Sequence, residues 1–179
     1  MNKIWKRLIL LIAVITSLGF NLNPAWATSL SVPIQGQYPY GNLCWATSSS
    51  MIISYFNGEN TNRTVTIAQD KYGLDDFNKT AQIEDSRNAV NTYAGRYGTI
   101  SNSALSWLNV KRQIDWGYPI YARWNYYSSA HAVVVKGYNE GNYRIIYNNP
   151  TSTGAEYSEN YDWFVSNEDF VWDKSLYYF

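Results

Sequence analysis

The chain has 179 residues, the size of one domain or of two small lobes that share one core. Its 14 Lys and Arg residues balance 14 Asp and Glu residues, so it has no basic field with which to collect nucleic acid. Aromatic residues make up 17% of the chain, a content that excludes a disordered protein. One Cys and one His exclude a disulfide framework and a zinc site of Cys and His ligands.

The N-terminal segment has the three parts of a secretory signal peptide. Residues 1–7 are basic, residues 8–20 are apolar, and an Ala-Trp-Ala cleavage pattern ends at Ala27. The apolar run is shorter than the roughly 20 residues that a membrane-spanning helix needs. We therefore predict a signal peptide over 1–27, cleavage after Ala27, a secreted mature domain over 28–179, and no stable membrane insertion.

The first half of the mature chain has the apolar spacing of helices. Asn42 is the expected N-cap of a helix through LCWATSSSMIISYFNGE, and Gly58 suits its C-cap. Three more helices are expected: a short one over 65–72, a broken one over 81–94, and one over 104–116. In the last of these helices, Leu105, Leu108 and Ile114 are expected to face inward.

After Gly117 the apolar period changes from 3.6 to 2, which indicates strands. The expected strands cover 119–124, 131–137, 143–147, 161–165 and 176–179. Helices followed by strands predict an α+β fold with an antiparallel sheet.

Cys44 is the only cysteine of a chain that we expect to be exported. A leftover thiol in such a protein indicates chemistry or intermolecular pairing. With Asn42 as N-cap, Cys44 lies in the first turn of its helix, where the positive end of the helix dipole stabilises a thiolate. A buried structural cysteine is the alternative interpretation.

Two residues of the second half are suited to assist a nucleophilic Cys44. His131 is the only imidazole, and a thiol nucleophile needs a base, although a lone His is also common as a packed or surface residue. Asn149 ends a predicted strand 18 residues later, from where its amide can orient the imidazole. Asn148 is a rival for that role, and an Asn before Pro is also a common turn residue.

Gln37, seven residues before Cys44, is the candidate side-chain donor of an oxyanion hole, together with the N–H of Cys44. Gln35 is a weaker candidate because it lies farther from the nucleophile. Either glutamine can instead be an exposed loop residue. The aromatic residues of 121–127 either pack within the sheet or, in part, line a substrate cleft.

Five segments of the chain resemble papain-like cysteine peptidases, in particular the compact bacterial bacteriocin-processing-like and staphopain-like branches: VPIQGQ, LCWATSSSMI, IDWGYPIYARW, HAVVVKGY and YNNP. The resemblance spans 32–150, and Cys-Trp-Ala at the start of a helix is its most specific part. It implies a two-lobe fold, in which a helical lobe with a central helix packs against an antiparallel sheet or barrel lobe. It places the nucleophile on Cys44, the base on His131, the orienting amide on Asn149 and the oxyanion glutamine on Gln37.

Two further positions can be compared with this family. Its members often carry Asp where this chain has Asn149, and either side chain accepts a hydrogen bond. They also often carry a Trp that covers the His–Asn pair, for which Trp163 is the candidate here.

Together these residues predict a secreted cysteine peptidase that hydrolyses peptide bonds through a Cys-His-Asn triad and an acyl-enzyme. The same triad would also suit a cell-wall peptide amidase or an acyltransferase. A secreted, aromatic-rich binding module with an incidental Cys44 is the alternative from a different class. We expect a monomer with a protein or peptide substrate, a protein inhibitor as a second candidate partner, no cofactor, no metal and no nucleic acid.

Overall fold

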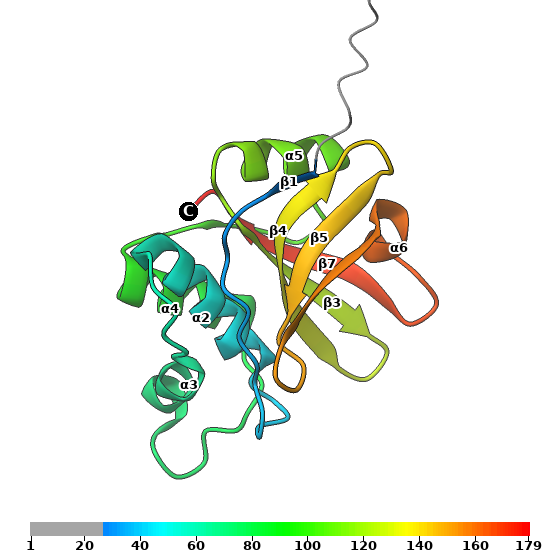
Figure 1. Cartoon of the computed structure of the whole chain (residues 1–179). Coiled ribbons are helices and arrows are strands. Elements are labelled where there is room, and N and C mark those ends of the chain that lie inside the picture. Colours follow the sequence, from blue (N-terminus) through cyan, green and yellow to red (C-terminus); the bar gives the residue numbers. More distant parts are fainter. Residues whose placement is uncertain (1–26) are drawn as a thin grey trace, which may run out of the picture.

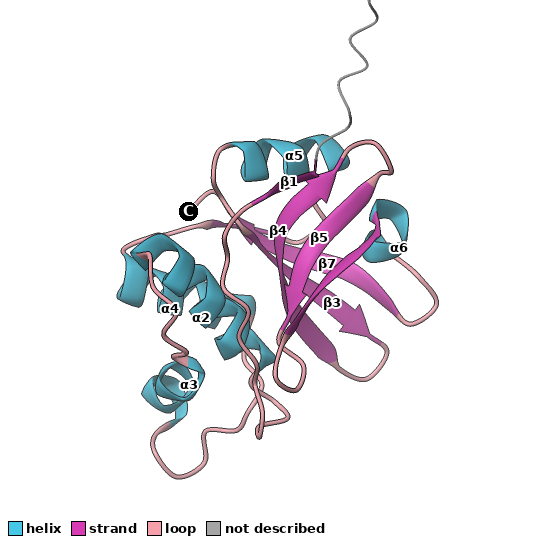
Figure 2. Ribbon diagram, viewed as in Figure 1, coloured by secondary structure: helices cyan, strands magenta, loops and turns pink. Residues whose placement is uncertain are grey.

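The computed structural model describes residues 27–179, so residues 1–26 of the predicted signal peptide lie outside the described part. The described chain forms five helices and one antiparallel sheet of seven strands (Figures 1 and 2). Helices α2, α3 and α4 gather on one side of the molecule and the sheet occupies the other (Figure 1). The predicted α+β fold with an antiparallel sheet is confirmed.

Helix α2 (Cys44–Asn57) is the central helix of the helical lobe, and its start differs from the predicted one. Leu43 rather than Asn42 occupies the N-cap position, and no side chain caps the helix. The side chain of Asn42 instead donates to the carbonyl of Asn78 at 2.9 Å. Cys44 is consequently the first residue of α2, and Gly58 ends the helix in the left-handed conformation, as predicted.

The next helices are α3 (Thr64–Tyr72), α4 (Ile83–Ala94) and α5 (Trp107–Asp115). Helix α4 is unbroken, contrary to the prediction of a broken helix, and Gln82 and Asp85 form a reciprocal capping box that fixes its start. Helix α5 begins later than predicted because Ser106 caps it. The inward prediction holds for Ile114 but is wrong for Leu108, which is exposed.

The strands are β1 (Ala27–Ser29), β2 (Thr99–Ser101), β3 (Ile120–Tyr126), β4 (Ala130–Asn139), β5 (Arg144–Asn149), β6 (Ala155–Asn160) and β7 (Phe170–Tyr177). They lie in the order β2-β7-β3-β4-β5-β6, and β1 pairs with β4. The predicted strand over 161–165 is wrong. This segment is helix α6 (Tyr161–Val165), because the side chain of Asn160 caps its first N–H groups.

The sheet separates two apolar cores. On β4, Ala132 and Val134 belong to the core under α2, whereas Val133 and Val135 belong to the core that includes α5 and α6. The first 11 residues of α2 are all buried, so apolar packing holds the helix that begins with Cys44.

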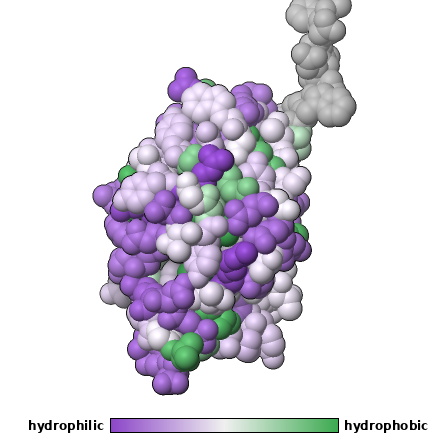
Figure 3. Space-filling model, turned by 90° about the vertical axis from the view of Figure 1, so that its left-hand side faces the viewer, coloured by the Kyte–Doolittle hydropathy of each residue, from purple (hydrophilic) through white to green (hydrophobic). Residues whose placement is uncertain are grey.

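The helix-covered side of the molecule is mostly hydrophilic, with apolar side chains in small separate areas (Figure 3). None of the helices in the described residues combines the length and the apolar character needed to cross a membrane.

Candidate active site

A cleft of about 730 Å³ lies where the start of α2 meets strands β3, β4 and β5. Three of the four predicted site residues line it, namely Cys44, His131 and Asn149. The fold therefore brings the start of α2, which carries Cys44, next to strands β4 and β5, which carry His131 and Asn149 and lie far from Cys44 in the sequence. The other residues that line the cleft include Trp45, Gln82, Tyr121, Arg123, Tyr126, Ala132 and Thr151.

Helix α2 and strand β4 are joined at Ala132. The hydroxyl of Ser48, one helical turn after Cys44, donates to the carbonyl of Ala132 at 3.0 Å. The backbone N–H of Ala132 also lowers the pKa of the Cys44 thiol. Since Ala132 directly follows His131, this junction holds the thiol close to the residue that carries the imidazole.

The environment of Cys44 acts on its charge in two opposing ways. Burial raises the pKa of the thiol, and hydrogen bonds from the N–H groups of Ala132, Trp45 and Cys44 itself lower it in part. The last two groups have no partner inside α2, because they belong to its first turn. Burial thus disfavours the thiolate form of Cys44 that the sequence predicts, whereas the N–H groups at the start of α2 favour that form.

His131 and Asn149 form a direct hydrogen bond. Nε2 of His131 lies 2.8 Å from Oδ1 of Asn149. Because an amide oxygen only accepts, Nε2 carries the proton and Nδ1 is left as the basic nitrogen. Burial lowers the pKa of His131, and the hydrogen bond to Asn149 raises it in part. The neutral imidazole is the form suited to accept a proton from a thiol.

The loop after β5 adds two donors to the same oxygen. The backbone N–H of Thr151 lies 3.0 Å and its hydroxyl 2.7 Å from Oδ1 of Asn149. The rival Asn148 is buried and donates to the carbonyls of Val32 and Pro33, so it takes no part in orienting His131.

The two glutamines are buried, and neither is among the residues that line the cleft. Nε2 of Gln37 donates to the carbonyls of Tyr40 at 2.9 Å and Gly41 at 3.1 Å, so both of its hydrogens hold the loop before α2. Nε2 of Gln35 donates to the hydroxyl of Ser54 at 3.0 Å and to a loop carbonyl. The oxyanion role of Gln37 stays a prediction, and it requires the amide to release one loop carbonyl.

A model of the Peptidase_C39 like family matches residues 29–177. The chain belongs to this family. It is a papain-like cysteine peptidase, as the sequence resemblance implies. A comparison with curated protein sequences found no match.

Two solved structures share the fold of the peptidase. A protein of Bacillus anthracis described as a C39-like peptidase superposes with a TM-score of 0.61 and 13% identity, covering 86% of this chain and 98% of the other. Xylellain, a cysteine protease from Xylella fastidiosa, superposes with a TM-score of 0.59 and 14% identity, covering 84% of this chain and 85% of the other. At these identities the similarity shows the fold alone.

In this peptidase the indole beside the imidazole comes from Trp124. Trp124 lies opposite His131 in the ladder between β3 and β4, with ring centroids 6.2 Å apart. Trp163, the candidate from the sequence, packs against Trp124 at 6.5 Å. The expected strands over 119–124 and 131–137 end at Trp124 and begin at His131, so a hairpin between them would have predicted this pairing. A short hairpin turn, closed by the N–H of Tyr126 on the carbonyl of Ser129, sets Trp124 opposite His131.

The lining of the cleft carries few charges. Among the described residues that line it, Arg123 is the only one with a fixed charge, and its Nε donates to Asp173 at 2.9 Å. Tyr121 and Tyr126 line the cleft, whereas Tyr127 is fully exposed. Within residues 27–179, no group of three or more His, Cys, Asp and Glu side chains is placed to hold a metal ion.

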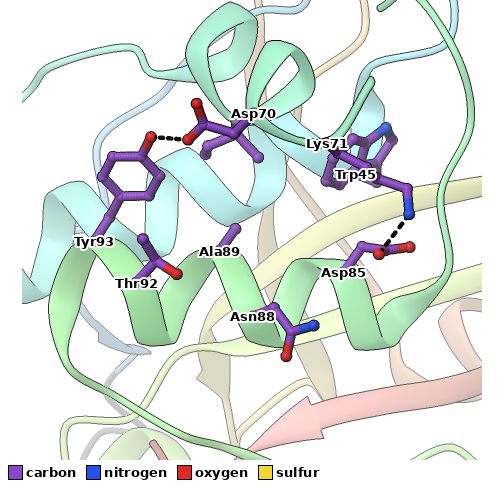
Figure 4. Close-up of a pocket in the computed structure, with 9 residues that line it drawn as sticks. Trp45, Asp70, Lys71, Asp85, Asn88, Ala89, Thr92 and Tyr93 are labelled. Atoms are coloured by element: carbon purple, nitrogen blue, oxygen red, sulfur yellow. Dashed lines mark hydrogen bonds and ion pairs between the residues drawn. The ribbon is translucent and has the colours of Figure 1, made fainter. Parts of the chain in front are cut away.

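A second pocket, of about 230 Å³, lies between α3 and α4 (Figure 4). Trp45 lines both this pocket and the cleft. The charged groups of this second pocket all have partners, because Lys71 forms an ion pair with Asp85 at 2.7 Å and the hydroxyl of Tyr93 donates to Asp70. It contains neither a thiol nor an imidazole, so the chemistry belongs to the larger cleft.

Proposed function

We propose that this peptidase is exported and hydrolyses peptide bonds through Cys44 as nucleophile, His131 as acid and base, and Asn149 as the group that orients His131. The observation that supports this most directly is the His131–Asn149 hydrogen bond at the cleft that also contains Cys44. The chain has a single Cys and a single His, so no other residues can supply this pair.

In the acylation step, Sγ of Cys44 attacks the carbonyl carbon of the peptide bond, and the thiol proton moves to Nδ1 of His131. The tetrahedral intermediate then expels the amine, which takes that proton from Nδ1 as the C–N bond breaks. The product is a thioester between Cys44 and the acyl part of the substrate. The N–H of Cys44 at the start of α2 is the backbone donor for the oxyanion.

In the deacylation step, water attacks the thioester carbonyl and gives a proton to Nδ1 of His131. The C–S bond breaks, the sulfur takes the proton back, and the carboxylic acid leaves. Through both steps Nε2 keeps its proton and its hydrogen bond to Asn149. The amide thus stabilises the imidazolium that forms transiently in each step.

Export follows from the N-terminal segment. Cleavage after Ala27 would leave Thr28 and Ser29 in β1, where they pair with Tyr138 and Gly137 of β4. The mature chain therefore keeps two of the three residues of β1 and loses the pairing of Ala27 with Asn139. Mass spectrometry of the protein from culture supernatant should give a chain that begins at Thr28, and a secreted chain that retains residues 1–26 would refute this proposal.

The catalytic proposal is tested with a mixture of synthetic peptides in H₂¹⁸O, with the products read by mass spectrometry. Hydrolysis places one ¹⁸O in each new carboxylate, whereas transfer to an amine places none. Cys44→Ala and His131→Ala should both abolish cleavage, and Asn149→Ala should reduce turnover more mildly, because the amide makes no bond to substrate. Cleavage that survives in Cys44→Ala would overturn the proposal.

A further inference from the structure

The loop after β5 places Thr151 next to the proposed triad. In the ladder between β4 and β5, Val134 pairs with Asn148. Continuing this register by three residues sets Thr151 opposite His131, although the ladder itself ends earlier. The Thr151 hydroxyl lies 2.7 Å from Oδ1 of Asn149 and 3.4 Å from Nε2 of His131. The shorter of these two contacts identifies the amide oxygen as the acceptor of the hydroxyl proton.

The backbone of this loop is held on both sides. The carbonyl of Pro150 accepts the N–H of Gln37 at 2.9 Å, and the carbonyl of Ser152 accepts the N–H of Tyr38 at 2.9 Å. The carbonyl between them, that of Thr151, accepts the N–H of Gly154 at 3.0 Å. Hydrogen bonds to three consecutive carbonyls therefore fix the backbone position from which the Thr151 side chain projects.

We infer that Thr151 is a positioning residue, which selects the end of the Asn149 amide that faces His131 and thereby selects the imidazole nitrogen that carries the proton. An amide has one accepting and one donating end, and the two are nearly equal in shape. Both donors of Thr151 contact Oδ1, which holds the accepting end at the junction with His131. A flipped amide would present NH₂ to Nε2, and the proton would then move to Nδ1, the nitrogen needed as base.

This inference rests on the proposed triad, but it has a test that needs no catalysis. The chain has one histidine, so a sample labelled with ¹⁵N-histidine gives one imidazole, and its two nitrogen shifts report which nitrogen carries the proton. The measurement uses Cys44→Ala at mildly alkaline pH, which keeps the imidazole neutral. The expected form has the proton on Nε2. A proton on Nδ1 in this parent protein would overturn the inference.

Substitutions at Thr151 then isolate the hydroxyl. Thr151 is exposed, and Thr151→Val keeps its shape without the donor, so folding should be unaffected. Thr151→Val should raise the share of the Nδ1–H form measurably, whereas Thr151→Ser should match the parent. With Cys44 restored, Thr151→Val should lower kcat/KM by about 3- to 10-fold, the effect of one neutral hydrogen bond, and Thr151→Ser should stay within about 2-fold.

A matched background separates this role from a general structural one. A carboxylate accepts at both of its oxygens, so it has no wrong end to present. In Asn149→Asp, replacing Thr151 by Val should therefore leave the imidazole tautomer unchanged. An equal tautomer shift in both backgrounds, or no shift in either, would overturn the inference. A shift in the Asn149 protein without any peptide hydrolysis would instead contradict the proposed function and leave the role of Thr151 standing.

Discussion

The two sides of the cleft are built by different forces. Cys44 begins a helix whose first 11 residues are buried, and the apolar core beneath the helix holds it in place. His131 and Asn149 lie at strand ends, next to an exposed loop over 151–153. Hydrogen bonds hold that loop against the segment that contains Gly36 and Gln37.

This difference separates stability from catalysis. Truncations of the apolar core beneath the nucleophile remove packing, so they should lower stability as well as turnover. Changes around the base alter single hydrogen bonds at the surface, so they should change turnover in a protein that still folds.

The largest effect is expected on the nucleophile side, at Gln37. If its amide becomes an oxyanion donor when substrate binds, Gln37→Ala should lower turnover by about 10²–10³-fold while alkylation of Cys44 stays nearly unchanged. The matched control is Gln35→Ala, since Gln35 is also a buried glutamine whose amide holds other groups. A loss of turnover in Gln35→Ala but not in Gln37→Ala would show that the wrong glutamine was chosen.

A smaller effect is expected at Gly36, where the division between the two sides should break. A Cβ at Gly36 would overlap the backbone of Ser152 and Thr153, so Gly36→Ala must displace the loop after Asn149. We expect a loss of about 1–3 kcal/mol in the free energy of unfolding, measured by denaturant titration, together with lower turnover. Gly41→Ala is the control for stability, because nothing lies within 4 Å of the added carbon. Equal stability of the two variants would contradict the close contact between Gly36 and the backbone of Ser152 and Thr153.

The smallest effect is expected from the charge of His131. Burial lowers its pKa in the folded protein, so on acidification the unfolded chain takes up the imidazole proton first. Stability should therefore fall as the pH drops below about 6.5, the ordinary value for histidine. Thermal unfolding of wild type and His131→Gln between pH 7.5 and 5.5 isolates this contribution. The wild type should lose more of its Tm, and parallel curves would show that the imidazole is not desolvated.

The helical lobe was largely predictable from sequence, because apolar spacing and glycine caps are local signals. The exception is the start of α2, where Asn42 bonds Asn78, 36 residues away, and does not cap the helix. The sheet lobe was less predictable at its edge. Strand β6 is the mostly polar segment AEYSEN, whereas YDWFV is rich in aromatic residues but forms α6 after the cap at Asn160.

In the candidate site, too, local features could be predicted from the sequence, whereas contacts between distant residues could not. Cys44 and His131 became candidates because each is the only residue of its kind, and Asn149 because it lies at the end of a predicted strand. The approach of Thr151 to His131 could not be predicted, because it depends on the register between β4 and β5. That register shifts at an irregularity between Val135 and Gly137, which no local pattern indicates.

The central claim is that His131 acts on Cys44, and the pH dependence of alkylation tests it most directly. Iodoacetamide reacts with the thiolate, and the chain has one cysteine, so intact-mass spectrometry follows Cys44 alone. Burial raises the pKa of the thiol, and in His131→Ala no imidazole remains to accept the thiol proton, so alkylation should require a higher pH than in wild type. Wild-type protein should react near neutral pH and the variant only under alkaline conditions. Coincident curves would show that the imidazole does not act on the thiol and would contradict the proposed mechanism.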